Sequence, residues 1–199
     1  MGRQRKPPSQ TWRAFLSNHV NNLASTYFFI VPTISFRVLF VFIVLADQRR
    51  RLLHFNVTAH PPAEWTAEQI TEAFPWDSAP RYLLQYRDSV CGDPFRQRVR
   101  GMGIREVLTA PRSPWQNPYA ERVIGSVRRE CLDHVVVLNE TCLRRTIRSY
   151  FNYYLKARTH LALGKDAPEP RAIQPPKLGA VVEIPEVGGL HHRYERQAA

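Results

Sequence analysis

Residues 113–134, SPWQNPYAERVIGSVRRECLDH, decide the fold that we expect for this chain. Asn117 before Pro118 predicts a helix start, because an Asn side chain can accept from unpaired backbone N–H groups and Pro suits the first helical position. At about 100° per residue, Glu121 and Arg128 then share one stripe. An apolar stripe runs beside it, formed by Ala120, Ile124, Val127 and Cys131. The apolar face of this helix is expected to pack against the core, and the adjacent face carries a carboxylate and a cation. An ordinary amphipathic surface helix would have the same periodicity.

The composition indicates a folded, basic protein. The chain has 199 residues, of which 44% are hydrophobic, so it can build one ordinary domain with a core. Lys and Arg number 28 against 17 Asp and Glu, which gives a net charge of +11. Such a surplus favours a polyanionic partner, with nucleic acid as the first candidate, although solubility or a membrane surface would also account for it.

The cysteines and the apolar runs indicate a cytoplasmic protein with no membrane partner. Cys91, Cys131 and Cys142 are odd in number and lack zinc-binding spacing, as is typical of free thiols in a reducing compartment. The most hydrophobic run, residues 38–46, is about half of what a membrane-spanning helix needs and is predicted to be a buried strand. The basic N-terminus is not followed by the apolar segment of a secretory signal.

The first half of the chain predicts a mixed sheet. Three runs rich in β-branched and aromatic residues, at 27–32, 36–46 and 50–58, are expected to form antiparallel strands. The middle run lacks polar alternation, so that strand should be covered on both faces. A helix over 64–74, a strand over 81–85, a helix over 94–100 and a strand over 104–108 then predict parallel crossovers.

The chain is expected to divide into three parts. Residues 1–25 are a basic lead with a short helix from Trp12, and residues 26–165 form the core domain, which ends with a packing helix over 142–155 capped by Asn139. Residues 166–199 are predicted to be a Pro-rich, extended C-terminal tail. The fold class expected is therefore α/β, with a mixed five-stranded sheet flanked by helices.

Three segments resemble a known family. Residues 113–131, SPWQNPYAERVIGSVRREC, resemble the last acidic motif of the integrase core shared by bacterial insertion-sequence transposases and retroviral integrases. Residues 158–170, RTHLALGKDAPEP, resemble the segment that follows it, and residues 82–104, YLLQYRDSVCGDPFRQRVRGMGI, are similar to the second acidic motif. The element order is also that of ribonuclease H-like folds. The resemblance runs from about Trp12 to Pro176.

The resemblance implies a metal-dependent site that this chain only partly retains. In the family, Asp, Asp and Glu hold two divalent cations, Mg²⁺ or Mn²⁺, for phosphoryl transfer on DNA. Glu121 matches the third carboxylate, but the alignment puts Tyr27 and Tyr86 at the two Asp positions. A neutral phenol is a poor ligand for Mg²⁺. Asp88 lies two residues beyond Tyr86 and is a weak substitute, because two strand residues span about 6.6 Å. Catalytic impairment is therefore expected.

The resemblance and the charge together predict DNA contacts. Phosphate contacts are expected from Arg112, Arg122, Arg128, Arg129, Arg144, Arg145 and Arg158, although each alone could be a solvated surface charge. His160 is expected either to pack near a helix end or to contact phosphate. Trp115 and Tyr119 are expected to anchor their loop rather than to stack on a base.

Three functional hypotheses remain open from the sequence. The chain could be a DNA-binding protein of transposase descent with little strand-transfer activity. It could instead be an interaction module that forms homo-oligomers or pairs with an intact transposase and regulates it. The third hypothesis is a basic globular protein with no role on nucleic acid.

Overall fold

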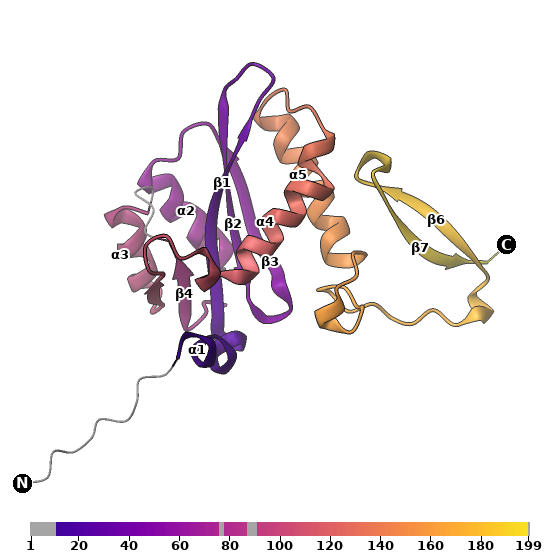
Figure 1. Ribbon diagram of the computed structural model, residues 1–199, viewed down its shortest axis with the longest axis horizontal. Coiled ribbons are helices and arrows are strands. Elements are labelled where there is room, and N and C mark those ends of the chain that lie inside the picture. Colours follow the sequence, from indigo (N-terminus) through magenta and orange to yellow (C-terminus); the bar gives the residue numbers. More distant parts are fainter. Residues whose placement is uncertain (1–10, 76–77, 87–90, 199) are drawn as a thin grey trace, which may run out of the picture.

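A five-stranded mixed sheet forms the centre of the computed structural model, which describes residues 11–75, 78–86 and 91–198 (Figure 1). The strands lie in the order β3-β2-β1-β4-β5. Their bounds are β1 Leu23–Pro32, β2 Val38–Ala46, β3 Arg51–Thr58, β4 Tyr82–Gln85 and β5 Arg105–Leu108. β1 pairs antiparallel with β2, and β2 with β3, whereas β4 runs parallel to β1 and to β5. This is the predicted mixed sheet of a ribonuclease H-like fold.

The prediction that residues 38–46 are covered on both faces is confirmed. The five consecutive residues from Val41 to Leu45 have no exposed surface. Alternate residues of a strand face opposite sides, so this run needs a helical layer on each side of the sheet. Val41, Ile43 and Leu45 pack into one core, while Phe42 and Val44 pack into the other.

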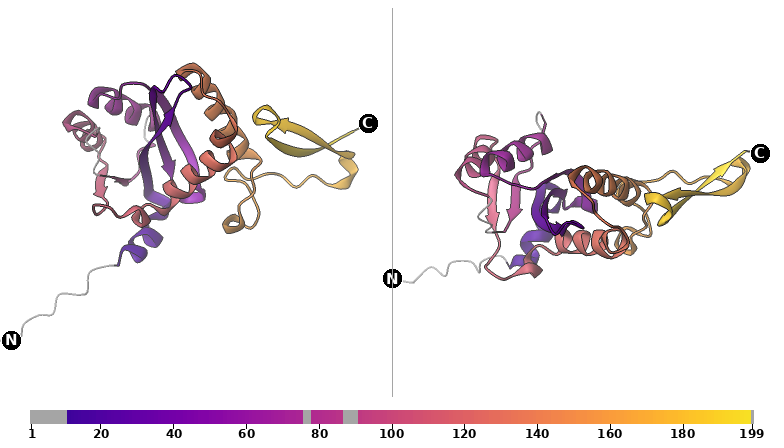
Figure 2. Two further views of the ribbon diagram at one scale, coloured as in Figure 1. Left: turned by 45° about the horizontal axis from the view of Figure 1, so that its top comes forward. Right: turned by 90° about the horizontal axis from the view of Figure 1, so that it is seen from above.

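The helices provide those two layers (Figure 2). α2 (Ala63–Ala73) and α3 (Asp93–Gly101) cover one face, where Ile70, Phe95 and Val99 are buried. α4 (Pro118–Glu130) and α5 (Glu140–Lys156) cover the other face with Val123, Val127 and several aromatic side chains of α5. The apolar spacing seen in the sequence therefore corresponds to the buried stripes of these helices.

The short helix from Trp12 and the start of α5 lie where the sequence predicted them. α1 (Trp12–His19) closes the base of the sheet, where Trp12, Phe15 and Leu16 pack against residues of β4. Asn139 caps α5 as predicted, because its side chain accepts from the backbone N–H of Cys142 at 2.8 Å. β1 begins at Leu23, four residues before the predicted start. Among the described residues no helix is both long and apolar enough to cross a bilayer.

The C-terminal segment differs from the extended chain that we expected. β6 (Ala180–Glu186) and β7 (His191–Gln197) form an antiparallel hairpin beside α5 (Figure 1). Its turn contains Gly188 and Gly189, both with positive φ, which glycine adopts at no steric cost. Val187 is buried in the core beside α5. The prediction of extended chain over these strands is therefore wrong, because charged residues on β7 masked the strand pattern.

Short 3-10 helices complete the described structure. They connect the strands and helices at Val20–Asn22, Gln48–Arg50, Pro114–Gln116, Leu132–His134, Leu161–Leu163, Pro176–Leu178 and Val187–Gly189.

Candidate active site

The helix α4 begins where the sequence predicted, but Asn117 does not cap it. Pro118 occupies the first helical position, and Glu121 lies in the first turn. Asn117 has φ −123° and ψ 61°, and its side chain accepts no hydrogen bond from the helix. The Asn117 side chain is fully buried, and neither polar atom has a hydrogen-bond partner among the described residues. The predicted side-chain cap is therefore wrong, because Asn117 lies outside the extended backbone conformation that N-cap residues usually adopt.

Glu121 lies against the end of β4. The Tyr86 hydroxyl donates to Glu121 Oε1 at 2.8 Å and also lies 3.2 Å from the carbonyl oxygen of Pro114. The Glu121 oxygen is the closer acceptor, so it takes the stronger bond. Tyr86 and Glu121 are 35 residues apart in the sequence, and the fold brings the two side chains into direct contact, as expected of residues in one site.

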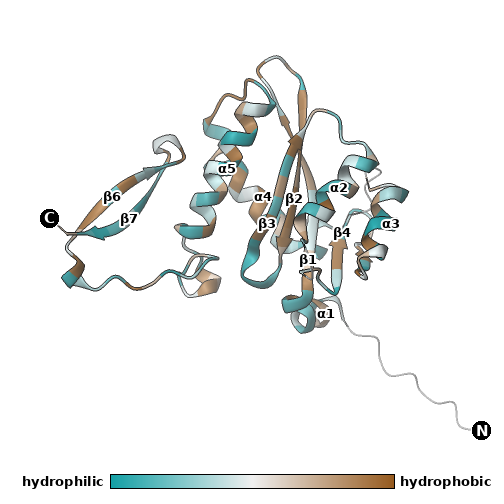
Figure 3. Ribbon diagram, turned by 180° about the vertical axis from the view of Figure 1, so that it is seen from behind, coloured by the Kyte–Doolittle hydropathy of each residue, from teal (hydrophilic) through white to brown (hydrophobic). Residues whose placement is uncertain are grey.

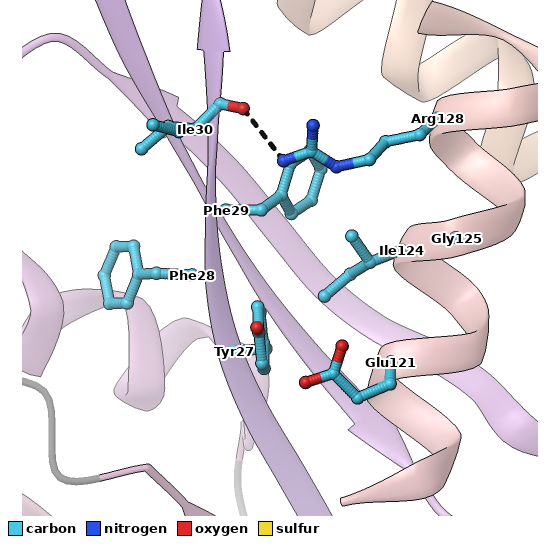
Figure 4. Close-up of a pocket in the computed structure, with 8 residues that line it drawn as sticks. All are labelled: Tyr27, Phe28, Phe29, Ile30, Glu121, Ile124, Gly125 and Arg128. Atoms are coloured by element: carbon cyan, nitrogen blue, oxygen red, sulfur yellow. Dashed lines mark hydrogen bonds between the residues drawn. The ribbon is translucent and has the colours of Figure 1, made fainter. Parts of the chain in front are cut away.

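Tyr27 completes this group from the middle of β1. Its ring meets the Tyr86 ring edge to face, with centroids 4.9 Å apart and an interplanar angle of 89°. Figure 4 shows the Glu121 carboxylate reaching from α4 toward the ring of Tyr27 on β1. They line a pocket of about 410 Å³, whose far end is formed by Arg128. The parallel pairing of β1 with β4 therefore brings both tyrosines to the helix that carries Glu121.

This donor set does not fit a divalent metal. Tyr27 and Tyr86 provide phenols where Mg²⁺ prefers carboxylates, and one Glu121 oxygen already accepts from Tyr86. Within the described ranges, no three His, Cys, Asp or Glu side chains are close enough to hold a metal ion. Asp88, considered as a substitute ligand, lies outside the described residues.

Asp47 is more than the turn residue suggested by its position after β2. The residue is 2% exposed, and its carboxylate accepts from the Ser25 hydroxyl at 2.6 Å. Burial raises the pKa of Asp47 to about 7, although the Ser25 hydrogen bond opposes this shift. Asp47 therefore joins β2 to β1, separately from the Glu121 pocket.

Two of the seven predicted DNA-contacting arginines are committed to the fold. Arg144 donates to the carbonyl oxygen of Val57 at 2.6 Å and to Glu140 at 2.7 Å, and it also bonds to Asn56. Arg158 donates to both oxygens of Glu130, at 2.5 and 2.7 Å. Glu140 stands four residues before Arg144 on α5, a spacing that allows this pair, but Asn56, Val57 and Glu130 lie on other elements and could not be predicted as partners.

The Glu130 carboxylate organises a partly buried polar cluster behind α4. Tyr150 donates to it at 2.8 Å. Burial by itself would raise the pKa of Glu130, but the hydrogen bonds from Arg158 and Tyr150 lower it below its ordinary value. The bond to Glu130 in turn raises the pKa of Arg158. This cluster ties the end of α4 to α5 and to the segment after α5.

His160 packs rather than facing a ligand. Its side chain is 6% exposed, and its ring meets Tyr154 edge to face. Burial, together with the neighbouring Arg158 guanidinium, lowers the pKa of His160 to about 4. The imidazole is therefore neutral at pH 7 and can accept from Arg158, whose Nη1 lies 3.1 Å from Nδ1.

The other five arginines are exposed, and two of them, Arg122 and Arg128, line the hollows beside Glu121. Arg128 reaches across the pocket and donates to the carbonyl oxygen of Ile30 at 3.3 Å, with its guanidinium over the Phe29 ring (Figure 4). Arg122 lines a second hollow beside Glu121. Arg112 has a positive φ of 54°, an uncommon backbone conformation for a non-glycine residue. Arg112, Arg122, Arg129 and Arg145 have no ion pair with another described residue.

Trp115 differs from its predicted anchoring role. The side chain is 68% exposed and lines the second hollow, of about 470 Å³, together with Glu121 and Arg122. Its neighbour Tyr119 does pack, because the Arg50 guanidinium lies 5.4 Å from its ring centroid. No local pattern in the sequence indicated Arg50, which is 9% exposed and packs against this ring of α4.

Comparison with known proteins agrees with this fold. Residues 102–168 match the family model of the integrase core domain, and no curated protein matches the chain. The similar solved structures include the Mos1 mariner transposase catalytic domain, with TM-score 0.59 and 9% identity over 71% of this chain and 77% of that one. The HTLV-2 integrase catalytic core domain, solved in complex with magnesium, has TM-score 0.55 and 8% identity over 74% and 93%.

A larger assembly also contains a similar chain. The match is to the simian T-cell lymphotropic virus intasome in complex with PP2A regulatory subunit B56 gamma, with TM-score 0.57 and 11% identity over 87% of this chain. The present chain spans 66% of that chain. At these identities the likeness shows the fold, which is that of integrase and transposase catalytic cores.

Proposed function

We propose that this chain is a DNA-binding protein of the integrase and transposase type, of the kind that serves DNA integration and recombination, and that it has lost metal-dependent strand transfer. The observation that carries the proposal is the hydrogen bond from Tyr86 to Glu121, with Tyr27 packed against Tyr86. The fold and the integrase core match at residues 102–168 support the ancestry.

DNA binding follows from the charge and its location. The chain has a net charge of +11, and Arg112, Arg122 and Arg128 lie on α4 or on the loop that leads to it. These exposed side chains can neutralise phosphates without reading bases, since phosphate contacts position a protein on DNA and carry no direct sequence information. We therefore expect salt-sensitive binding with little sequence preference.

Loss of catalysis follows from the chemistry of the two phenols. The HTLV-2 core was solved in complex with magnesium, and the family resemblance implies carboxylates at three positions. Here only Glu121 can carry a negative charge at pH 7 among these three, and Tyr86 donates to one of its oxygens. The site accordingly retains a single carboxylate hydrogen-bonded by a phenol, which suits neither two cations nor activation of an attacking hydroxyl.

The proposal is tested by restoring the carboxylates. Purified native protein and the double variant Tyr27→Asp/Tyr86→Asp are compared for Mn²⁺ binding by calorimetry and for nicking of supercoiled plasmid. We expect no nicking by the native chain and Mn²⁺ binding only by the double variant. Tyr27→Phe/Tyr86→Phe is the matched control, since it removes the hydroxyls without adding charge.

Two results would overturn this proposal in different ways. Plasmid nicking by the native protein that is lost in Glu121→Gln would refute catalytic loss. Failure of the native protein to bind duplex DNA at low salt would refute the DNA-binding function itself.

A second candidate function is an interaction module for another integrase-type chain. An exposed apolar surface at the β1–β2 turn favours it, formed by Ile34, Phe36, Val136 and Leu138. The backbone N–H of Ile34 donates to the carbonyl oxygen of Val137 at 2.9 Å, which brings the two segments of this surface together. The HTLV-2 core was solved in a dimeric form. Sedimentation of the native chain and of Phe36→Asp tests self-association, and a monomer in both would refute it.

A further inference from the structure

A second cleft lies between the end of α5 and the C-terminal hairpin. It encloses about 750 Å³ and shares no lining residue with either hollow beside Glu121. Its walls come from three segments that are distant in sequence: the end of α5 with Lys156, the loop 164–174, and residues 193–195 of β7. Figure 1 shows this loop and the hairpin on the α5 side of the sheet.

The wall formed by the loop is held by specific bonds. Arg49 donates to Asp166 at 2.8 Å and to the carbonyl oxygens of Ala167 and Pro168 at 2.8 and 2.9 Å. The backbone N–H of Glu169 donates to the carbonyl oxygen of Leu155 at 2.9 Å. The loop is thus tied to the sheet and to α5 before any ligand arrives, which lowers the ordering cost of binding.

The hairpin wall is tied to the same loop. The backbone N–H of Arg196 donates to the Gln174 side-chain oxygen at 2.5 Å, and His191 stacks on Tyr153 of α5 with ring centroids 4.5 Å apart. The Nε2 atom of His191 lies 2.7 Å from the carbonyl oxygen of Glu130. The two sides of the cleft are therefore connected at both ends of the hairpin.

The cleft has more cationic than anionic side chains, and three of the cations form no ion pair within the described structure. Its lining includes Lys156, Lys165, Arg171 and Arg193 against Asp166 and Glu195. Asp166 is paired with Arg49, and Arg193 is paired with Glu195 at 2.6 Å and with Glu186 at 2.9 Å. Lys156, Lys165 and Arg171 are exposed, and none has an ion pair with another described residue.

Two features of the lining suit a flexible anionic polymer. Lys165 has a positive φ of 66°, and such strained positions cluster at ligand-binding sites. Tyr194 is 60% exposed, and its hydroxyl donates to Glu183 at 3.3 Å, which orients the ring at the cleft. An exposed ring beside cations is the combination with which proteins bind single strands, because bases stack on the ring while cations neutralise phosphates.

Hydropathy separates the two strands of the hairpin. Figure 3 shows β7 as largely hydrophilic, whereas β6 is more hydrophobic. β7 provides the part of the cleft lining that comes from the hairpin, so the polar strand is the one that faces this hollow. A purely apolar ligand would leave the cationic groups of the cleft without a counter-charge.

We propose that this cleft binds a segment of single-stranded DNA, with phosphates at Lys156, Lys165 and Arg171 and a base stacked on Tyr194. This inference rests on the proposed DNA-binding function and adds a second contact surface to it. A strand bound here lies beside α5 and the hairpin, apart from the arginines around Glu121.

The test measures fluorescence anisotropy of a labelled oligothymidine with the full chain across a range of salt concentrations. The variant Lys156→Gln/Lys165→Gln/Arg171→Gln removes the three cleft charges. The matched control Arg98→Gln/Arg100→Gln/Arg105→Gln removes three exposed charges from α3 and β5. Circular dichroism melting of each variant checks that it is folded.

We expect the cleft variant to bind at least tenfold more weakly than the control at low salt. The slope of log K against log salt should fall by about 0.7 for each lost phosphate contact, or about 2 in total. Tyr194→Ala should weaken binding about tenfold, while Tyr194→Phe should retain it, since stacking on one base is worth roughly that factor.

The outcomes separate this inference from the function on which it rests. Equal binding by the cleft variant and the control, in a chain that still binds the oligonucleotide, would refute the cleft and leave DNA binding intact. Single-strand recognition would be refuted if the cleft variant lost the same affinity for duplex DNA as for single-stranded DNA and Tyr194→Ala left both affinities unchanged. Absence of any DNA binding by the native chain would refute both.

Discussion

Replacement of Asp47 by Asn should change how the stability of this protein depends on pH. The Asp47 carboxylate is buried at the end of β2, accepts one hydrogen bond from Ser25, and has a second oxygen without a hydrogen-bond partner in the described structure. A buried carboxylate with one uncharged donor is costly to ionise. The amide introduced by Asp47→Asn would keep an acceptor for Ser25 and remove the charge.

The magnitude follows from the pKa of Asp47. Burial raises this pKa from 3.8 to about 7, and each unit corresponds to about 1.4 kcal/mol, so ionisation costs the fold on the order of 4 kcal/mol. The folded state binds the proton more tightly than the unfolded state. This contribution to stability is therefore fully present below pH 4, is lost as the pH rises to about 7, and stays lost above that.

Urea denaturation of the native protein and the Asp47→Asn variant between about pH 4 and pH 8.5 measures this effect. The difference in the free energy of unfolding should move in favour of the variant by about 4 kcal/mol over this range. Asp133→Asn, at an exposed position, is the matched control and should show a nearly constant difference. A change below about 1 kcal/mol for the Asp47 variant would refute the buried, protonated carboxyl.

Three further substitutions test the fold. Glu130→Ala should cost about 3 kcal/mol in chemical denaturation, because it removes the carboxylate that pairs with a partly buried guanidinium and accepts from a phenol. Glu140→Ala, at a more exposed pair, should cost less than about 1 kcal/mol, and similar losses for the two variants would contradict the buried cluster. Phe36→Asn should raise the free energy of unfolding by about 1 kcal/mol, because Phe36 has φ 59°, a conformation that Asn adopts more readily, and its 93% exposed ring loses little packing. An unchanged midpoint of thermal unfolding would argue against backbone strain at this position. Gly179→Ala should disorder the hairpin, because the added Cβ would overlap the backbone of Gln197; retained amide-exchange protection of β7 would contradict this.

The sheet could be predicted because its signals are local. The uninterrupted apolar run at 38–46 is short and rich in β-branched and aromatic residues, which indicates a strand with both faces covered. The helix starts at Pro118 and Glu140 likewise follow from residues beside them. The family motif then indicates which helix carries Glu121 and where Tyr27 and Tyr86 should lie relative to it.

The roles of individual cations could not be predicted from their spacing. Arg144 and Arg158 look like their exposed neighbours in the sequence, but Val57 and Glu130 accept from them in the fold. Trp115 was expected to be an anchor and is exposed, because the loop before α4 turns its ring outward. Pairing and burial depend on residues far along the chain.

The amino-acid sequence by itself predicted the element order of the five-stranded core and the cover on both faces of its sheet, and the family resemblance predicts that Tyr27 and Tyr86 stand at two carboxylate positions. These properties depend on residue type and short-range periodicity. Tertiary structure alone decided that Tyr86 donates to Glu121, that Asp47 is buried against Ser25, and that a cationic cleft lies between α5 and β7. Each of these contacts joins residues distant in sequence, and only the packing of the sheet, helices and hairpin brings them together.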